Sequence, residues 1–327
     1  MKRREFIACL GGAATLPLSA LAQPIERQRR VAVLMDLTEN DDSRPRLAAF
    51  VQGLAAMGWS DGHNLRIDVR WGANNLERSQ TLAAELLAIN PDVVLSSATP
   101  ATVAMQRTSK TTPIVFALVA DPVGAGLVES LARPGANVTG FTLFEFSIAA
   151  KWLQLLKEIA PGIKRVAVLR DVGIAAGVAQ YSVIQSAAPS FGVELRPLGL
   201  RDADEIERAI SAFGPGPNGG IVVTASPLAG VHREQIISLA ARYQLPSVFA
   251  YRHFVAAGGL LAYGPDLVDP YRRAAGYVSR ILKGEKPAEL PVQAATDYKL
   301  AINVRTAKLL GLAVPPALLA RADEVIE

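Results

Sequence analysis

Two short stretches of the chain place a pair of hydroxyl side chains where an apolar run ends. The first reads SATP at residues 97–100, and the second reads TASP at residues 224–227. Pro is favoured at the first helical position, and Ser or Thr before it makes a good N-cap, so each stretch predicts a strand running directly into a helix. The free N–H groups of a helix start suit a carboxylate or a phosphate. Two roles stay open for Thr99 and Ser226, namely ligand binding and helix capping alone.

Short β-branched runs alternate with segments of helical period along the chain, which is typical of a parallel α/β fold. The runs are mostly apolar at consecutive positions, as expected for strands covered by helices on both faces. We predict strands at 30–36, 65–71, 92–97, 113–119, 165–171, 193–198, 220–225, 246–251 and 259–264. A helix at about 269–283, a strand at YKLAINV and a final helix follow.

The order of these runs repeats. RVAVLMD at 30–36 is matched by RVAVLRD at 165–171, SATP by TASP, and TPIVF at 112–116 by LPSVF at 245–249. Three matches in the same order indicate two similar doubly wound α/β lobes, one starting near residue 29 and the other near residue 164. The remaining segment of roughly 60 residues is too short for a third domain. We expect it to complete both lobes, so that the chain crosses between them more than once.

Ligands of open parallel sheets bind beyond the carboxyl ends of the strands. Polar and aromatic side chains at those ends are Asp36, Ser97, Thr99, Asp121, Asp171, Thr224, Ser226, Tyr251, Tyr263 and Asp266. The stretch DPVGAGLVE at 121–129 places Gly124-x-Gly126 after a strand, but Glu129 stands where a dinucleotide site needs a third glycine. We therefore predict no nucleotide or other cofactor, and interpret these glycines as a loop and helix start.

No nucleophile elbow and no metal-binding motif is found. GWSDG at 58–62 matches G-x-S-x-G in its letters, but it precedes a predicted strand, whereas a nucleophile elbow follows a strand and opens a helix. The chain has no H-E-x-x-H, and its three histidines are far apart without ligand spacing. Its one cysteine, Cys9, lies in an N-terminal segment with basic residues 2–4, an apolar stretch and Ala20-Leu21-Ala22, which together are typical of a cleaved signal peptide. RREFI at 3–7 resembles a twin-arginine export motif. Without residues 1–22 the chain keeps 31 basic and 29 acidic residues, a balance that does not indicate nucleic-acid binding.

Three longer stretches resemble one family. DPVGAGLVESLARPGANVTG at 121–140, the segment from YRHFV to LPVQ at 251–293, and the C-terminal segment 298–327 are similar to the substrate-binding proteins of ABC transporters, specifically the tryptophan/tyrosine type. The resemblance covers nearly the whole chain after the signal peptide. It implies a type I periplasmic binding fold, in which two α/β lobes joined by three crossing strands close on a small ligand. It also implies an inner-membrane permease as partner and a location in the periplasm.

The resemblance further implies a set of ligand-binding positions: Ser97, Thr99, Asp121, Thr139, Thr224, Ser226, Tyr263 and Asp266. For an amino acid, we expect the carboxylate on the Ser97–Thr99 loop and the ammonium on Asp121, with Asp266 as second choice. Tyr251, Tyr263 or Phe116 could wall an apolar or aromatic side chain. The alternative for both acidic residues is a structural role at a helix start.

We therefore expect a monomeric, non-enzymatic receptor with no metal. Its first lobe would comprise residues 29–143 and about 266–290, and its second residues 144–265 and about 291–327. Two alternatives stay open: an exported two-lobed α/β enzyme such as a hydrolase, and a periplasmic binding protein that serves a sensor.

Overall fold

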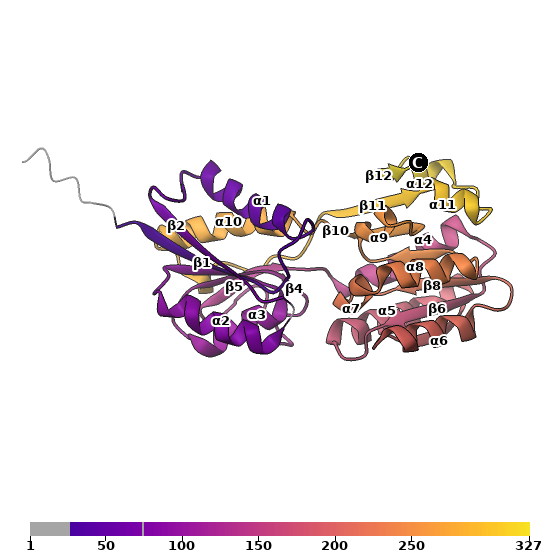
Figure 1. Ribbon diagram of the computed structural model, residues 1–327, viewed down its shortest axis with the longest axis horizontal. Helices are drawn as coiled ribbons and strands as arrows, with labels where there is room; N and C mark the ends of the chain where they lie inside the picture. The colour runs from indigo at the N-terminus through magenta and orange to yellow at the C-terminus, as the bar shows by residue number, and fades with distance from the viewer. Residues whose placement is uncertain (1–26, 74) are drawn as a thin grey trace, which may run out of the picture.

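The computed structural model describes residues 27–73 and 75–327 (Figure 1). The predicted signal peptide, residues 1–22, lies outside the described residues. The described chain forms two α/β lobes that lie end to end along the longest axis.

The first lobe is built on a parallel sheet of five strands in the order β2-β1-β3-β4-β5. Its strands are β1 (Arg29–Met35), β2 (Leu65–Trp71), β3 (Val93–Ser97), β4 (Ile114–Val119) and β5 (Val138–Thr142). Helices α2 (Leu76–Ala88) and α3 (Ala98–Thr108) cover one face, and α1 (Arg44–Ala56) lies on the other. The residues of β3, β4 and β5 are all buried, as expected for strands covered on both faces.

The second lobe is built on a sheet of seven strands in the order β12-β11-β10-β9-β8-β6-β7, of which only β10 and β11 pair antiparallel. Its strands are β6 (Arg165–Arg170), β7 (Glu194–Gly199), β8 (Gly219–Val223), β9 (Ser247–Phe249), β10 (Leu261–Pro265), β11 (Tyr298–Asn303) and β12 (Glu324–Ile326). The helices of this lobe are η1 (Phe146–Ile148), α4 (Ala149–Ile159), α5 (Ala175–Phe191), α6 (Ala203–Phe213), α7 (Pro227–Val231), α8 (Arg233–Arg242), α9 (Arg252–Ala256), α11 (Val304–Leu309) and α12 (Pro316–Leu319).

The two sheets repeat one topology, which confirms the duplication predicted from the sequence. The order β2-β1-β3-β4-β5 of the first sheet corresponds, strand for strand, to β7-β6-β8-β9-β10 of the second. The RVAVL stretches form most of β1 and β6, the PIVF stretch leads into β4, and the PSVF stretch contains β9. SATP and TASP begin at the ends of β3 and β8, so they occupy the same position in the two lobes.

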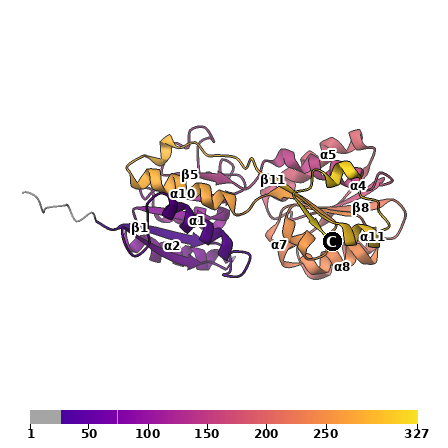
Figure 2. The same cartoon turned by 90° about the horizontal axis from the view of Figure 1, so that it is seen from above.

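Helix α10 (Asp269–Leu282) returns to the first lobe from the second. Figures 1 and 2 place this late segment, coloured orange, beside the indigo helix α1. The contact is close, because a Cβ on Gly53 of α1 would lie 2.8 Å from the Cβ of Ala275 of α10. The short helix η2 (Pro287–Glu289) follows α10.

Three segments connect the lobes: residues 143–145 after β5, residues 266–268 after β10, and residues 290–297 between η2 and β11. The first and the third are hydrogen-bonded to each other. On the first-lobe side, Gln293 N donates to Gly140 O, and Thr142 N donates to Gln293 O, each at 2.9 Å. On the second-lobe side, Glu145 N donates to the hydroxyl of Tyr298 at 3.0 Å. The first and third connections are therefore tied together at both of their ends, which makes them one hinge.

The lobes have separate hydrophobic cores. Phe50 and Tyr277 belong to one buried cluster of the first lobe, and Trp152 and Ile184 belong to a cluster of the second. Val292 packs in the first lobe, so we propose that the third connection begins after Gln293, beyond the predicted limit of about 290. The other lobe limits stay predictions.

Three details differ from the sequence prediction. β5 and β12 were not predicted, because β5 holds a glycine and two threonines in five residues and β12 has only three residues. The stretch at 121–129 forms turns and no helix, so the predicted helix start there is wrong. Two short helices and β12 replace the predicted final helix.

Candidate functional site

The carboxyl edges of the two sheets are the edges turned toward the other lobe. β5 ends at Thr142, and the chain enters η1 of the second lobe at Phe146. β10 ends at Pro265, and the chain enters α10 of the first lobe at Asp269. Because β1–β5 are mutually parallel, as are β6–β10, every strand in each of these sets ends at the same boundary. Loops that follow those strands therefore meet between the lobes.

The SATP and TASP stretches are called the first and second hydroxyl exits below. The first joins β3 to α3 and contains a strained residue. Ser97 occupies the N-cap position, but its hydroxyl makes no capping bond and instead pairs with the Tyr271 hydroxyl of α10 at 2.6 Å. Ala98 has a φ of 63°, which costs a residue with a Cβ about 1–2 kcal/mol. Thr99 lies in the first helical turn and is half-buried, so its predicted role as N-cap is wrong. Its hydroxyl has no hydrogen-bond partner among the described residues.

The second exit, from β8 to α7, uses its hydroxyls internally. Ser226 is the N-cap predicted from the sequence, because its oxygen accepts from Leu228 N at 3.1 Å. Its hydroxyl also donates to Asp171 Oδ2 at 3.0 Å. Thr224 donates to Leu169 O at 3.0 Å, and both hydroxyl residues are buried. The internal partners of Ser226 and Thr224 leave these side chains little capacity for a ligand.

Three other predicted residues also have structural surroundings. Phe116 is 0% exposed in the core of the first lobe, so its ring has no surface that could wall a ligand. Thr139 is equally buried and donates to Leu290 O. Asp266 Oδ1 accepts from Val268 N at 2.7 Å at the start of α10, which is the structural alternative considered from the sequence.

Asp121, Tyr251 and Tyr263 keep polar atoms without a partner in the described parts of the chain. Asp121 follows β4 and is half-buried, and Oδ1 accepts from Gly124 N at 2.8 Å while Oδ2 bonds to nothing. The Tyr251 and Tyr263 hydroxyls form no hydrogen bond with a described residue, and both side chains are half-buried at the ends of β9 and β10. With Thr99, these are the predicted residues that keep a polar side-chain atom free, among the described residues, to bind a ligand.

Sequence reasoning missed a basic residue at this boundary. Arg46 lies in the first turn of α1, which follows β1, and its side chain is half-buried. Burial raises the pKa of Tyr271, and the positive charge of Arg46 acts to lower it. Burial also raises the pKa of Tyr251, while the positive charge of Arg46 acts to lower it. Since Tyr271 belongs to the first lobe and Tyr251 to the second, Arg46 lies where the lobes face each other.

His253 follows Tyr251 on the second lobe, and the two rings stack with centroids 5.5 Å apart. Burial lowers the pKa of His253 to about 4, the Asp42 charge acts to raise it, and the charges of Arg233, Arg46 and Arg252 act to lower it. The ring is therefore neutral at pH 7, with one nitrogen that can donate and one that can accept a hydrogen bond.

Asp36 is a buried carboxyl group at the end of β1, with 6% of its surface exposed. Burial raises its pKa from 3.8 to about 6, while the hydrogen bond that Ser79 donates to Oδ1 at 3.2 Å acts the other way. Asp171 stands at the same position at the end of β6. Both lobes thus bury an aspartate where the sheet order reverses.

Residues 30–326 match the family described as ABC transporter substrate binding protein, which is almost the whole described chain. The chain belongs to this family. It is a solute-binding receptor that captures a small ligand and works with an ABC permease. Substrate-binding proteins of ABC transporters are typically exported to the periplasm or the cell exterior.

Solved structures and a named relative are similar over most of this ABC substrate-binding protein. A conserved domain protein from Vibrio cholerae is 31% identical with a TM-score of 0.82, covering 91% of this chain and 100% of its own. A substrate-binding protein with adhesive properties from Clostridium difficile, in a ligand-free, open structure, is 25% identical with a TM-score of 0.75, covering 91% and 99%. A tyrosine-binding protein of Clostridioides difficile is 24% identical over 88% of this chain and 82% of its own. An ABC domain from Streptococcus pneumonia in complex with L-Trp is 24% identical with a TM-score of 0.82, covering 91% and 100%, and shows the shared fold.

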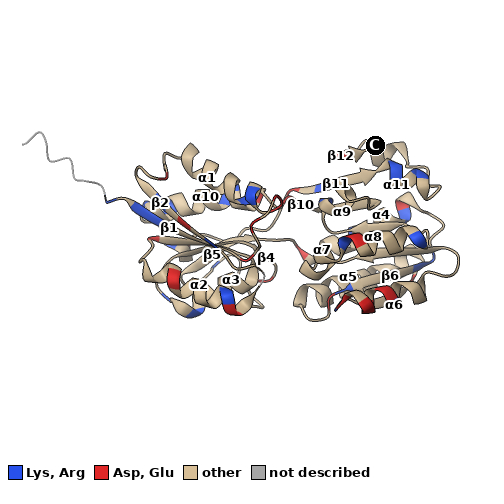
Figure 3. Ribbon diagram, viewed as in Figure 1, with Lys and Arg blue, Asp and Glu red and all other residues tan. Residues whose placement is uncertain are grey.

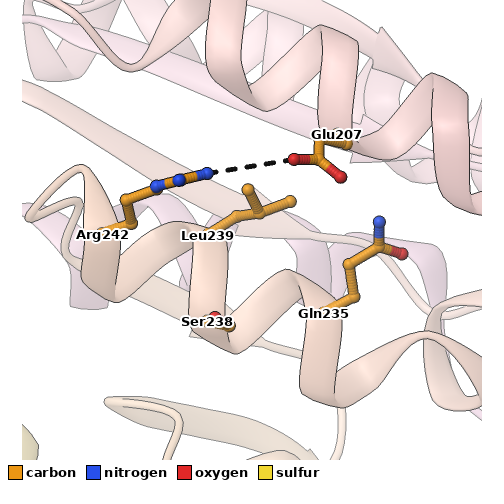
Figure 4. A pocket seen from close by; sticks show the side chains of 5 residues that line it. All are labelled: Glu207, Gln235, Ser238, Leu239 and Arg242. Carbon is orange, nitrogen blue, oxygen red and sulfur yellow. Dashed lines mark ion pairs between the residues drawn. The ribbon is translucent and has the colours of Figure 1, made fainter.

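A surface hollow of this ABC substrate-binding protein lies away from the lobe boundary. It measures about 380 Å³ between α6 and α8 and is lined by Glu207, Gln235, Ser238, Leu239 and Arg242 (Figure 4). Glu207 and Arg242 form an ion pair of 3.9 Å between exposed side chains, and Gln235 donates to Ala203 O at 2.8 Å. Glu207, Arg242 and Gln235 therefore already have partners in their own lobe, and the hollow gives no reason to expect a ligand there.

Residues 27–73 and 75–327 of the substrate-binding protein lack two further features. No helix there has the length and the apolar character to cross a membrane. No group of three or more His, Cys, Asp or Glu side chains there could hold a metal ion.

Proposed function

We propose that this chain is a periplasmic receptor for an amino acid or a similar small carboxylate, with an aromatic side chain among the candidates. It is exported by a cleaved N-terminal signal peptide and delivers its ligand to the permease as a monomer. It performs no reaction, uses no cofactor and binds no nucleic acid. Acidic and basic residues both occur in each lobe, which suits a small zwitterionic ligand better than a polyanion (Figure 3).

The observation that carries this proposal is the group of unsatisfied polar atoms at the facing carboxyl edges. Asp121 Oδ2 provides a negative acceptor for an ammonium group, and the Thr99 hydroxyl and the free N–H groups of the α3 start suit a carboxylate. Asp121 is preferred to Asp266, because Asp266 Oδ1 already accepts bonds from Val268 and Asp269 N. Tyr251 and Tyr263 would contact the ligand from the second lobe.

The printed names of the relatives support this ligand class. One relative is called tyrosine-binding, and one solved structure holds L-Trp. A half-buried tyrosine ring can pack against an aromatic side chain while its hydroxyl bonds a polar group. We therefore place L-tyrosine and L-tryptophan first among the ligands to be tested.

A ligand screen tests the proposal. The chain without residues 1–22 is screened by thermal shift against the twenty amino acids, aromatic carboxylates and sugars, because a ligand held only by the folded protein raises Tm. Hits are then measured by calorimetry with Asp121→Asn and Thr99→Val. We expect Asp121→Asn to weaken binding by about 1.5–3 kcal/mol, since a hydrogen bond to a charged group is lost. Thr99→Val should cost about 1 kcal/mol.

Asp204→Asn is the matched control, because Asp204 is exposed at the start of α6 and the substitution removes the same charge from the second lobe. It should bind as the wild type does. Normal affinity in both Asp121→Asn and Thr99→Val would refute this site. Turnover of an ester or glycoside, with no small molecule raising Tm, would refute the receptor in favour of a hydrolase.

A further inference from the structure

Arg46 is placed against the usual preference of a helix start. The first turn of α1 contains no acidic residue and two arginines, Arg44 and Arg46. The partial positive charge at a helix N-terminus repels cations and favours anions. A basic side chain in this turn needs compensation from a negative group nearby.

The two arginines are compensated differently. Arg44 is exposed and pairs with Glu39 at 3.3 Å and with Asp41 at 3.2 Å. Arg46 is half-buried, and no carboxylate of the described residues lies within ion-pairing distance of it. A charge that is partly removed from water is costly unless it is paired, so a negative partner would stabilise Arg46 more than it would stabilise an exposed arginine.

The groups around Arg46 can hold an anion together with it. On the first lobe, Tyr271 is fixed by its 2.6 Å hydrogen bond with Ser97, and Arg46 acts on the same hydroxyl. On the second lobe, the Tyr251 hydroxyl and the His253 ring lie within range of the Arg46 charge. Hydroxyl and imidazole N–H groups donate hydrogen bonds to a carboxylate.

We propose that Arg46 binds the carboxylate of the ligand and that Tyr251 and His253 contact this same group from the second lobe. The inference deepens the proposed function, on which it rests, because it assigns the carboxylate to a guanidinium and not to hydroxyl and N–H groups alone. Arg46 then determines specificity: the receptor selects ligands with an anionic group and rejects the matching amides. The carboxylate also links the lobes, because donors of both lobes bind it only when they approach each other.

Calorimetry with charged and uncharged probes tests this assignment. L-tyrosine and L-tyrosinamide, and L-tryptophan and L-tryptophanamide, are titrated into the wild type, Arg46→Gln and Arg46→Lys. Arg44→Gln is the matched control, since it removes the same charge from the same helical turn. We expect Arg46→Gln to weaken binding of the acids on the order of 10- to 100-fold and Arg46→Lys to weaken it less. The amides should bind weakly to the wild type and no more weakly to Arg46→Gln, and Arg44→Gln should bind as the wild type does.

The outcomes separate this proposal from the proposed function. If an acid binds the wild type and Arg46→Gln equally, the assignment of Arg46 is overturned while the receptor remains. If no amino acid binds the wild type, the proposed ligand class is wrong, and Arg46 is then judged with sodium malonate and sodium sulfate as probes. A rise in Tm with malonate and sulfate that is smaller in Arg46→Gln than in Arg44→Gln supports an anion on Arg46, and an equal rise overturns it. Far-UV circular dichroism of each variant establishes that it is folded.

Discussion

Replacing Asp36 by Asn should stabilise the protein, and the gain should depend on pH. The Asp36 carboxyl group has its pKa raised from 3.8 to about 6 by burial. At about 1.36 kcal/mol per pKa unit, keeping this group ionised at pH 7 costs the folded state about 3 kcal/mol. The asparagine of the variant carries no charge, and its amide oxygen can still accept the bond that Ser79 donates at 3.2 Å. The Asp36→Asn variant should therefore gain up to about 3 kcal/mol at pH 7.

The sign of the pH dependence follows from the raised pKa. Below pH 3.8, Asp36 is protonated in both the folded and the unfolded chain, so its ionisation costs nothing. Between pH 3.8 and about 6, the unfolded chain releases the proton while the folded chain keeps it, so the free energy of unfolding falls. Above about pH 6, the folded group is ionised too, and the cost stays constant. The advantage of Asp36→Asn should thus be small at pH 4 and reach its full size by pH 7.

Urea denaturation of both proteins at pH 4, 5, 6 and 7.5 measures this difference. Trp59 and Trp71 both lie in the first lobe and report its unfolding by fluorescence, whereas Trp152 lies in the second. Asp171→Asn is the control at the equivalent position of β6. Asp171 accepts from Gly173 N and from Ser226 through different oxygens, and an amide keeps only one acceptor, so this variant should lose about 1–3 kcal/mol. An equal stability difference at pH 4 and pH 7.5 for Asp36→Asn would refute the reasoning.

Two further predictions concern the hydroxyl exits. Ala98→Gly should raise the free energy of unfolding by up to about 1 kcal/mol in urea, because glycine adopts a φ of 63° without strain, and a loss of stability would contradict this. Ser226→Ala should lower it by about 1–3 kcal/mol, because it removes both the cap on Leu228 N and the donor to buried Asp171, with ligand affinity measured by calorimetry unchanged. Weaker ligand binding in Ser226→Ala at full stability would place Ser226 in the site.

The sequence predicted the two sheets well because their strands are signalled locally. A strand covered on both faces is apolar at consecutive positions, and β1, β3, β4, β6 and β8 all have such runs. Duplication added a second signal, since equivalent strands kept similar residues. β5 carries neither signal, because Gly140 and Thr139 interrupt its apolar residues. Its burial comes from its neighbours β4 and Gln293, which the chain supplies from distant segments.

The site was harder to predict, because the position at a strand end does not tell which partner a side chain finds. Tertiary contacts satisfy three of the predicted hydroxyls: Ser97 at the end of β3, Thr139 in β5 and Thr224 directly after β8. Arg46 was missed because it belongs to a helix turn and not to a strand end. A sequence signal for it does exist: RPRL at 44–47 puts two arginines into a helix start, where acidic residues are preferred. A local preference that is broken in this way often marks a functional residue.

The two hydroxyl exits began as copies, and their differences favour the first lobe as the holder of the ligand's charge. In the second lobe, Ser226 caps its helix and bonds Asp171, so the TASP exit is saturated by its own lobe. In the first lobe, Ser97 is turned toward Tyr271, Ala98 is held in a left-handed conformation, and Thr99 keeps a free hydroxyl among the described residues. Strain of this kind persists only where the surroundings impose it, and it gathers at ligand-binding positions. Arg46 adds a positive charge on the same lobe, beside the same Tyr271. An anionic group bound there would use what the SATP exit leaves unsatisfied, whereas at TASP it would have to displace hydrogen bonds that the protein already makes.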